Sequence, residues 1–256
     1  MKRYCFTVDD NIRFLKELTH SDAKSIFEHP YLAMYRRLHE RYGAKIQLNL
    51  FYEVDGFDLS QMTSKYNDEW KSNSHWLKLS FHSRMENVYP YQYSDYDEVF
   101  TDCKSVHDEI LRFASEEALG KTTTVHYCKA TDEGIRALKD NGVKGLLGLY
   151  GDFNKPRHSY NNTPDECDAM RKGGGIIRDG IMYSGIDVIL NNFSVDEIIS
   201  ELEKIKDRDF VKIMIHEQFF YEDYPHYIEN YEERLKAAFE FLIGSGFHSI
   251  FFEELL

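Results

Sequence analysis

Short apolar runs of this chain end directly in side chains that can bind a metal ion or move a proton. The run at residues 5–8 is followed by Asp9 and Asp10, and several later runs end in the same way. In a β/α barrel the active site is built at the carboxyl ends of the strands, so such side chains would converge on one rim. The polar residues in these positions are Asp9, Asp10, His82, Glu86, His126, Asp152, His216 and Glu217.

Asp10, His82 and Glu86 have the chemistry of a divalent-metal site. Imidazole and carboxylate groups from separate elements are common ligands of such ions. His82 and Glu86 are four residues apart, so a helical turn would place both side chains on one face. Three protein ligands leave coordination positions open for water and substrate. Asp9 could then accept a proton from water, and His216 could protonate a leaving group from the far side of the barrel.

Each of these residues also has a purely structural interpretation. Asp9 and Asp10 could cap a helix that begins near Asn11, because a carboxylate accepts hydrogen bonds from free backbone N–H groups. A lone histidine such as His82 is more often a hydrogen-bonded structural residue than a ligand, and Glu217 could be a solvated loop residue. The convergence of several such residues on one rim is what favours a functional site.

The elements that must position these residues alternate along the whole chain. Strand-like runs rich in Val, Ile, Thr, Phe and Tyr are separated by amphipathic helical patterns. This alternation predicts a single α/β domain over residues 1–256, a seven- or eight-stranded and possibly distorted β/α barrel, with an open doubly wound sheet as the second choice. The predicted strands are 4–8, 45–52, 76–81, 122–128, 145–150, 187–190, 211–215 and 249–252, and the predicted helices are 23–42, 96–118, 132–141, 195–205 and 227–244.

Composition and charge exclude several classes of function. The 256 residues contain 31 Lys and Arg against 44 Asp and Glu, a formal net charge of −13, which disfavours a nucleic-acid partner. No apolar stretch approaches the ~20 residues that span a bilayer, and no signal-peptide core follows Met1, so we expect a cytoplasmic protein without a membrane partner. The four cysteines are far apart and form no CxxC pair.

Three motifs resemble those of a known family. Phe6-Thr7-Val8-Asp9-Asp10 resembles T-F-D-D, the first motif of the polysaccharide deacetylases, the NodB-like carbohydrate esterases. His82-Ser83-Arg84-Met85-Glu86 resembles the second motif, H-S/T-x-x-H, and Ile213-Met214-Ile215-His216 is similar to the late L-x-L-H motif. The order and broad spacing agree from the first predicted strand to the seventh.

The resemblance implies a fold, a cofactor and a reaction. It implies a distorted β/α barrel that holds a divalent metal ion, zinc by preference, and removes acetyl groups from N-acetylated sugars. Carried over to this chain, it implies that Asp9 is the general base, that Asp10 and His82 are metal ligands, and that His216 is the general acid.

Two positions depart from the family pattern. Glu86 stands where the second ligand histidine would be, so either Glu86 or His126 completes the metal shell. The R-x-P motif, whose Arg orients the base, has no clear match, and residues 124–127 occupy the strand concerned. Asp187 is only faintly similar to the family's Asp that supports the base. His126, Asp187 and Glu217 therefore stay candidates for substrate binding or for the third ligand.

We expect a metal-dependent hydrolase that deacetylates a carbon–nitrogen amide bond in an N-acetylated sugar or a related small amide. Two alternatives stay open: a catalytically altered barrel that binds carbohydrate without deacetylating it, and a glycoside hydrolase that pairs Glu217 with Glu253. Aromatic side chains near the second motif and after His216 could stack on sugar faces or pack loops onto the barrel. They are Tyr89, Tyr91, Tyr93, Tyr96, Phe219, Phe220, Tyr221, Tyr224 and Tyr227.

Overall fold

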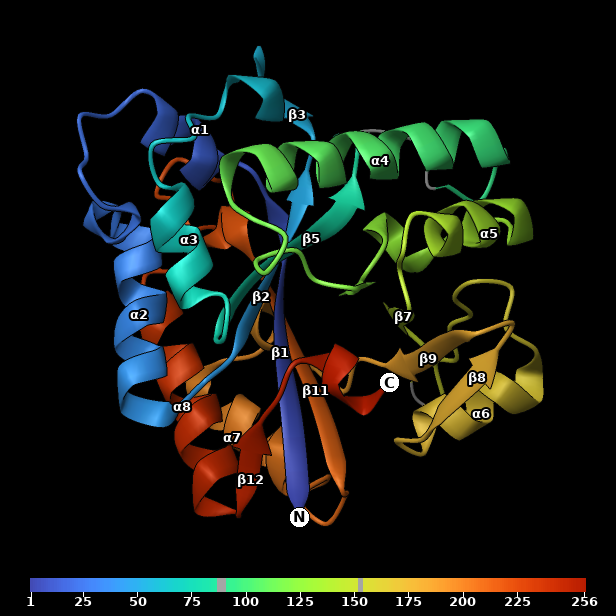
Figure 1. Ribbon diagram of the computed structural model, residues 1–256. Coiled ribbons are helices and arrows are strands. Elements are labelled where there is room, and N and C mark those ends of the chain that lie inside the picture. The colour runs from blue at the N-terminus through green and yellow to red at the C-terminus, as the bar shows by residue number, and fades with distance from the viewer. Residues whose placement is uncertain (87–90, 152–153) are drawn as a thin grey trace.

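The computed structural model describes residues 1–86, 91–151 and 154–256, and a mostly parallel sheet system dominates it (Figure 1). The larger, six-stranded sheet has the order β10-β11-β1-β2-β5, and β12 also pairs with β1. All of its pairs are parallel. Its strands are β1 (Lys2–Asn11), β2 (Ile46–Phe51), β5 (Leu77–Ser83), β10 (Val188–Ile189), β11 (Phe210–His216) and β12 (Phe247–Ser249).

A second sheet of four strands has the order β6-β7-β9-β8, in which only the outer β8 runs antiparallel to its neighbour. Its strands are β6 (Thr122–Thr123), β7 (Gly145–Gly148), β8 (Gly175–Arg178) and β9 (Ile181–Gly185). A small antiparallel hairpin, β3 (Glu53–Val54) with β4 (Phe57–Asp58), follows β2. The predicted strands 4–8, 45–52, 76–81 and 211–215 are thus confirmed as β1, β2, β5 and β11.

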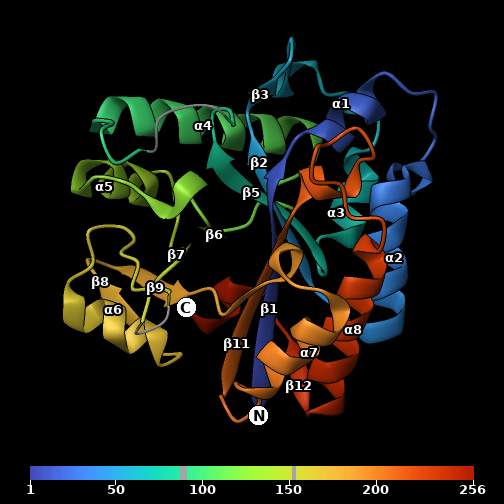
Figure 2. The same ribbon diagram turned by 180° about the vertical axis from the view of Figure 1, so that it is seen from behind.

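Helices cover the outer faces of both sheets (Figures 1 and 2). The longer ones bury an apolar stripe, and side chains cap their first turns: Thr131 accepts a hydrogen bond from the Gly134 N–H, and Ser194 pairs with Glu197. None of the described helices is long and apolar enough to cross a bilayer. The helices are α1 (Arg13–Thr19), α2 (Pro30–Tyr42), α3 (Asn67–Asn73), α4 (Tyr96–Phe113), α5 (Asp132–Asp140), α6 (Pro164–Arg171), α7 (Val195–Glu203) and α8 (Tyr231–Gly244).

The expected α/β class is confirmed, but the described strands do not form one closed barrel. One seam lies between β5 and β6, where only isolated hydrogen bonds cross, such as Gly120 N–H to the Leu79 carbonyl at 2.8 Å. The other lies between β9 and β10, which belong to different sheets and form no ladder with each other. Both seams have the same cause, because β6 and β10 contain only two residues each and cannot support a full ladder.

The carboxyl-terminal segment fills the space between the two sheets, where both views place the C-terminus (Figures 1 and 2). The predicted strand 249–252 is misplaced, because β12 is Phe247–Ser249 and the chain then turns into the 3₁₀ helix η6 (Phe252–Leu255). Phe252 packs in a small apolar cluster with Cys5 and Leu147. A side chain at Gly145 would come within 2.9 Å of the Phe252 ring, so this position requires glycine.

Candidate metal centre and active site

Asp9 and Asp10 both reach the same pocket because β1 is irregular at its carboxyl end. Successive side chains of a regular strand point to opposite faces. At Asp10 the backbone enters the left-handed region, with φ of 62°, and the register with β2 shifts between Val8 and Asn11. Aspartate tolerates this conformation better than most residues. Both carboxylates therefore line one pocket of about 310 Å³.

His82, near the end of β5, is oriented by a backbone carbonyl. Its Nδ1 lies 2.5 Å from the Thr124 carbonyl oxygen, so Nδ1 carries the hydrogen and Nε2 presents its lone pair to the pocket. The imidazole side chain is only 3% exposed. This is the tautomer that a metal-ligating histidine needs.

His126 is oriented in the same way from the other sheet. It follows β6, at the start of the 3₁₀ turn η3 (His126–Cys128). Its Nε2 donates to the backbone carbonyl of Glu86 at 2.8 Å, which leaves the Nδ1 lone pair facing His82. Tyr127 and Cys128 then adopt left-handed φ values of 59° and 56°, so the chain turns away directly after His126. The predicted strand 122–128 is too long, since β6 ends at Thr123 before this turn begins.

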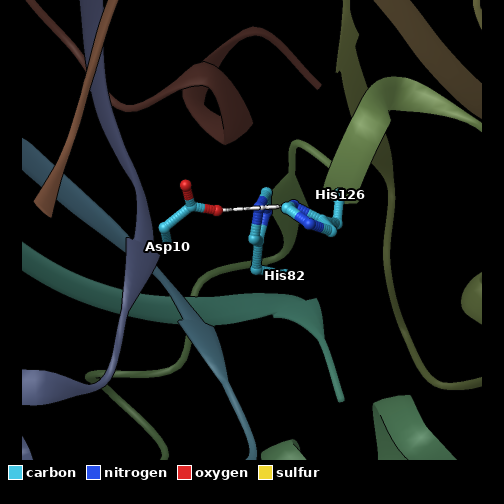
Figure 3. A group of neighbouring side chains, drawn as sticks. All are labelled: Asp10, His82 and His126. Atoms are coloured by element: carbon cyan, nitrogen blue, oxygen red, sulfur yellow. Dashed lines mark hydrogen bonds and ion pairs between the residues drawn. The ribbon is translucent and has the colours of Figure 1, made fainter. Parts of the chain in front are cut away.

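Asp10, His82 and His126 bring three ligand atoms together (Figure 3). Asp10 Oδ1 lies 3.0 Å from His82 Nε2 and 3.3 Å from His126 Nδ1, and the two nitrogens are 3.1 Å apart. Atoms bound tetrahedrally at about 2.0–2.1 Å from a zinc ion lie about 3.3 Å from one another. The triangle fits a cation held by one carboxylate and two imidazoles.

The pKa values of the acidic and imidazole side chains at the site depend on one another. Burial alone would raise the pKa of Asp10, but with no ion bound the protonated imidazoles of His126 and His82 donate hydrogen bonds to its carboxylate and hold that pKa well below its usual value. Burial would lower the pKa of His82, but the carboxylates of Asp9 and Asp10 raise it. The pKa of Asp9 is raised, chiefly by burial. Asp10 is thus the stronger anion of the pair, and Asp9 has the higher proton affinity.

Asp9 and His216 face each other across neighbouring strands. They are paired in the register of β1 with β11, and both line the pocket. Asp9 Oδ1 accepts a hydrogen bond from Asn49 Nδ2 at 2.6 Å. His216 Nδ1 lies 2.8 Å from Asn191 Oδ1, so its Nε2 is the nitrogen left to exchange a proton. A group that can accept a proton and a group that can donate one therefore flank the ligand triangle.

Glu86 does not reach the triangle with its carboxylate. Its exposed side chain lines the rim of the pocket, and it is its backbone carbonyl that contacts His126. Asp187 does not line this pocket and is engaged by two cations, with Arg208 Nη1 at 2.5 Å and the buried Lys212 Nζ at 3.0 Å.

Glu217 serves as a helix cap. Its buried carboxylate accepts the N–H groups of Ile12, Arg13 and Phe14 at the start of α1. The structural alternative of a solvated Glu217 is therefore wrong, and so is the idea that Asp9 and Asp10 cap this helix. Glu217 does not line the pocket, so it is not a candidate for the third ligand.

A glycoside hydrolase built on Glu217 and Glu253 is not supported. Glu253 lies in η6 and contacts Lys78 at the amino end of β5, at 2.5 Å, whereas Glu217 follows the carboxyl end of β11. The two carboxylates are therefore at opposite ends of the strands, and the Glu217 carboxylate is occupied by α1 and by the Tyr221 hydroxyl.

Aromatic residues reach the pocket from one of the two expected groups. Phe219 and Tyr224 line it, and their rings lie 5.2 Å apart. Tyr91 is instead buried, and its hydroxyl donates to Asp102. Tyr127, which the sequence analysis did not single out, is 58% exposed at the mouth. Tyr89 and Asp152 lie outside the described residues.

Three carboxamides at the site were not predicted from the sequence. Asn49 contacts Asp9, Asn191 contacts His216, and Gln218 Nε2 donates to Asp10 Oδ2 at 2.6 Å. Only Asn49 leaves a sequence signal. It alternates with Gln47 in an otherwise apolar strand, a pattern that indicates a polar face inside the sheet.

The comparisons with known proteins concern the fold. No family model matches the chain, and no curated protein matches it in sequence. Solved structures do match it along 99% of its length. One is a family 4 acetyl xylan esterase from Clostridium thermocellum in complex with a cobalt ion, with a TM-score of 0.56 and 11% identity over 90% of that chain.

Two further structures match over the same 99% of this chain. A peptidoglycan N-acetylglucosamine deacetylase has a TM-score of 0.58 and 11% identity, with 87% of that chain covered. A 4-α-glucanotransferase from Thermococcus litoralis has a TM-score of 0.60 and 13% identity, with 40% of that chain covered. The chain shares the fold of these structures. The resemblance seen in the motifs is thus confirmed for the fold, and because a glucanotransferase shares it, the reaction must be argued from the site.

Proposed function

We propose that this chain is a metal-dependent hydrolase that removes an acetyl group from the nitrogen of an amino sugar or a related small amide. The observation that carries the proposal is the triangle of Asp10, His82 and His126, flanked by Asp9 and His216 in one pocket. The solved structures of the same fold include enzymes named as an acetyl xylan esterase and an N-acetylglucosamine deacetylase, which supports deacylation as the reaction.

The ligands in this proposal are Asp10, His82 and His126, with zinc as the ion. His126 is preferred to Glu86 as the third ligand because its Nδ1 lies 3.3 Å from Asp10 Oδ1, while the Glu86 side chain is exposed at the rim. Two imidazoles and one carboxylate are a common ligand set of catalytic zinc, and they leave a coordination position open.

The reaction needs one proton acceptor and one proton donor in addition to the ion. A divalent ion in the triangle would lower the pKa of a water molecule and polarise the substrate carbonyl. Asp9 takes the proton of the attacking water, since its raised pKa makes it the better base of the two carboxylates. His216 delivers a proton from Nε2 to the departing nitrogen, while Asn191 holds its Nδ1. Asp9 and His216 are thus assigned as base and acid.

The walls of the pocket support a ring-bearing substrate. Phe219, Tyr224 and the exposed Tyr127 present aromatic surfaces at the mouth. Such rings stack on the apolar faces of sugars, and their hydroxyls provide polar contacts. An acetylated amino sugar is therefore the substrate class proposed here. A barrel that binds carbohydrate without deacetylating it is not favoured, because every group that the reaction requires meets in this pocket.

One experiment tests the proposal directly. Purified protein is analysed for bound metal, and acetate release is measured with N-acetylglucosamine oligomers and with a small acyclic acetamide. We expect about one equivalent of a divalent ion, as one three-ligand site predicts, and acetate release that a chelator abolishes. Asp10→Asn should lose both the ion and the activity. Wild-type protein that binds no divalent ion would overturn the proposal.

The remaining expectations stay predictions. They are a single domain over residues 1–256, a cytoplasmic location, and a carbohydrate or small amide as the partner of the pocket.

A further inference from the structure

The two carboxylate oxygens of Asp10 have different partners. Oδ1 faces His82 Nε2 and His126 Nδ1, at 3.0 and 3.3 Å. Oδ2 points the other way and accepts a hydrogen bond of 2.6 Å from Gln218 Nε2. Gln218 follows His216 by two residues and lies in the 3₁₀ turn η5 (Glu217–Phe220). One oxygen is thus left for an ion, and the other is already occupied by the chain.

The position of Gln218 is set by elements that the chain separates widely. The Glu217 carboxylate accepts the N–H groups of Ile12, Arg13 and Phe14, which follow Asp10 directly after Asn11. This bond set fixes η5 to the beginning of α1. Gln218 and Asp10 therefore sit on two segments that are joined to each other, and the hydrogen bond between them does not depend on a mobile loop.

The carboxamide oxygen of Gln218, Oε1, is buried and is left without a hydrogen bond from the residues that the structure describes. A buried acceptor without a partner costs about 1–3 kcal/mol. An apolar side chain of the same size would avoid that cost, so the carboxamide is best explained by what its Nε2 does at Asp10.

We infer that Gln218 is a positioning residue that makes Asp10 a ligand through Oδ1 alone. The inference rests on the proposed metal site. A carboxylate that turns both oxygens to an ion occupies two coordination positions, and the second is then lost to water or substrate. By holding Oδ2 away from the triangle, Gln218 keeps that position open. It also fixes the direction of Oδ1, which raises the affinity for the ion because less freedom is lost on binding.

The test is a titration of metal-free protein with cobalt(II) ions, followed by visible absorption. Gln218→Met keeps the size of the side chain and removes the donor. We expect its dissociation constant for cobalt to rise about 10–100-fold, as is usual when a partner of a ligand is lost. We also expect the spectrum of the bound ion to change, because Asp10 becomes free to bind through both oxygens and the coordination geometry is altered.

A matched control separates this effect from general damage to the pocket. Asn191→Leu makes the same carboxamide-to-apolar change in the same pocket wall, but its partner is His216, which is not one of the three ligands. Its affinity for cobalt should equal that of the wild type. Thermal unfolding without metal shows whether Gln218→Met is folded. If it is not, Gln218→Asn, which keeps the amide but is too short to reach Asp10, should show the same loss.

The cobalt titrations test the role of Gln218 separately from the proposed metal site. If the wild type does not bind cobalt, the proposed metal site is wrong. If the wild type binds it, and the folded variant binds it with the same affinity and the same spectrum, the role of Gln218 is wrong while the proposed site stands.

Discussion

The two histidines of the site are each oriented through the nitrogen that points away from the pocket. His82 uses Nδ1 on the Thr124 carbonyl, and His126 uses Nε2 on the Glu86 carbonyl. His82 therefore presents Nε2 and His126 presents Nδ1 to the same point in the pocket. A backbone carbonyl can only accept a hydrogen bond, so each ring keeps a hydrogen on its outward nitrogen and can offer the inward one to an ion.

The contribution of His126 can be separated from that of Glu86. His126→Ala removes one of three ligand atoms and should lower the bound divalent ion, after dialysis, to a small fraction of an equivalent. Glu86→Gln should keep the ion, because its backbone carbonyl is unchanged and its side chain lies at the rim. Elemental analysis of both proteins measures the result. Loss of the ion in Glu86→Gln with retention in His126→Ala would assign the third ligand to Glu86.

His216 should affect the reaction and not the ion. Its Nε2 is free to exchange a proton, and loss of a general acid lowers the rate about 10²–10⁴-fold. His216→Asn should therefore lower kcat by that range for the best substrate, with the metal content unchanged. Steady-state kinetics and metal analysis of the same preparation measure both. A loss of metal in this variant would place His216 among the ligands.

The sequence predicted the charged residues of the site better than their partners. Asp9, Asp10, His82, His126 and His216 could be found because each follows an apolar run, and in parallel strands such positions share a rim. The carboxamides that contact them, such as Gln218, could not be found, since a contact of 2.6 Å between residues 208 positions apart depends on the folded backbone. The same holds for the choice between Glu86 and His126.

The short elements α1 and β6 are stabilised by residues far away in the sequence, and they could not be predicted for the same reason. α1 has seven residues, and its N-cap residue Ile12 offers no side-chain cap. Its free N–H groups are satisfied by Glu217, about 200 positions away. Likewise, β6 is only two residues long, and its partner β7 lies more than 20 positions away. The longer α4, α5, α7 and α8 could be predicted, because their apolar periodicity and first-turn residues are local signals.

Removal of the Glu217 carboxylate should destabilise the junction of α1 and η5. In Glu217→Ala three backbone N–H groups lose their acceptor, and we expect the free energy of unfolding to fall by about 2–3 kcal/mol. Urea unfolding followed by circular dichroism measures this. Glu222→Ala is the control, because Glu222 is exposed and lies in the same connection. Equal stabilities of the two variants would contradict the capping role.

A buried histidine between α4 and α5 should make stability depend on pH. Burial lowers the pKa of His107 from 6.5 to about 4, against a hydrogen bond to the Asn141 backbone. As the pH falls from about 6.5 to about 4, the unfolded chain binds a proton at this residue and the folded chain does not. Folding stability should therefore decrease over that window, by about 3 kcal/mol for this group.

Comparison of variants isolates this contribution from that of other groups. His107→Gln should show a flatter dependence of unfolding free energy on pH between about 6.5 and 4 than the wild type. His248→Gln changes an exposed histidine and should follow the wild type. Parallel curves for all three proteins would show that His107 does not remain neutral in the fold.

At the scale of the whole molecule, the carboxyl-terminal segment packs between the two sheets and contacts both of them. Phe252 lies against Cys5 of the larger sheet and Leu147 of the smaller one. Phe252→Ala should open a cavity between them and lower the free energy of unfolding by about 3–5 kcal/mol. Denaturant titration measures this loss. Leu256→Ala, at an exposed position, is the control and should be neutral.

The seam between β5 and β6 gives the proposed ion a mechanical role. Asp10 and His82 belong to the six-stranded sheet, while His126 follows the four-stranded one. An ion bound by all three would cross-link the two sheets at a junction that otherwise has few hydrogen bonds. Binding of the ion would then raise the free energy of unfolding, and its loss would lower it. The same binding event that activates the site would also stabilise the contact between the two sheets.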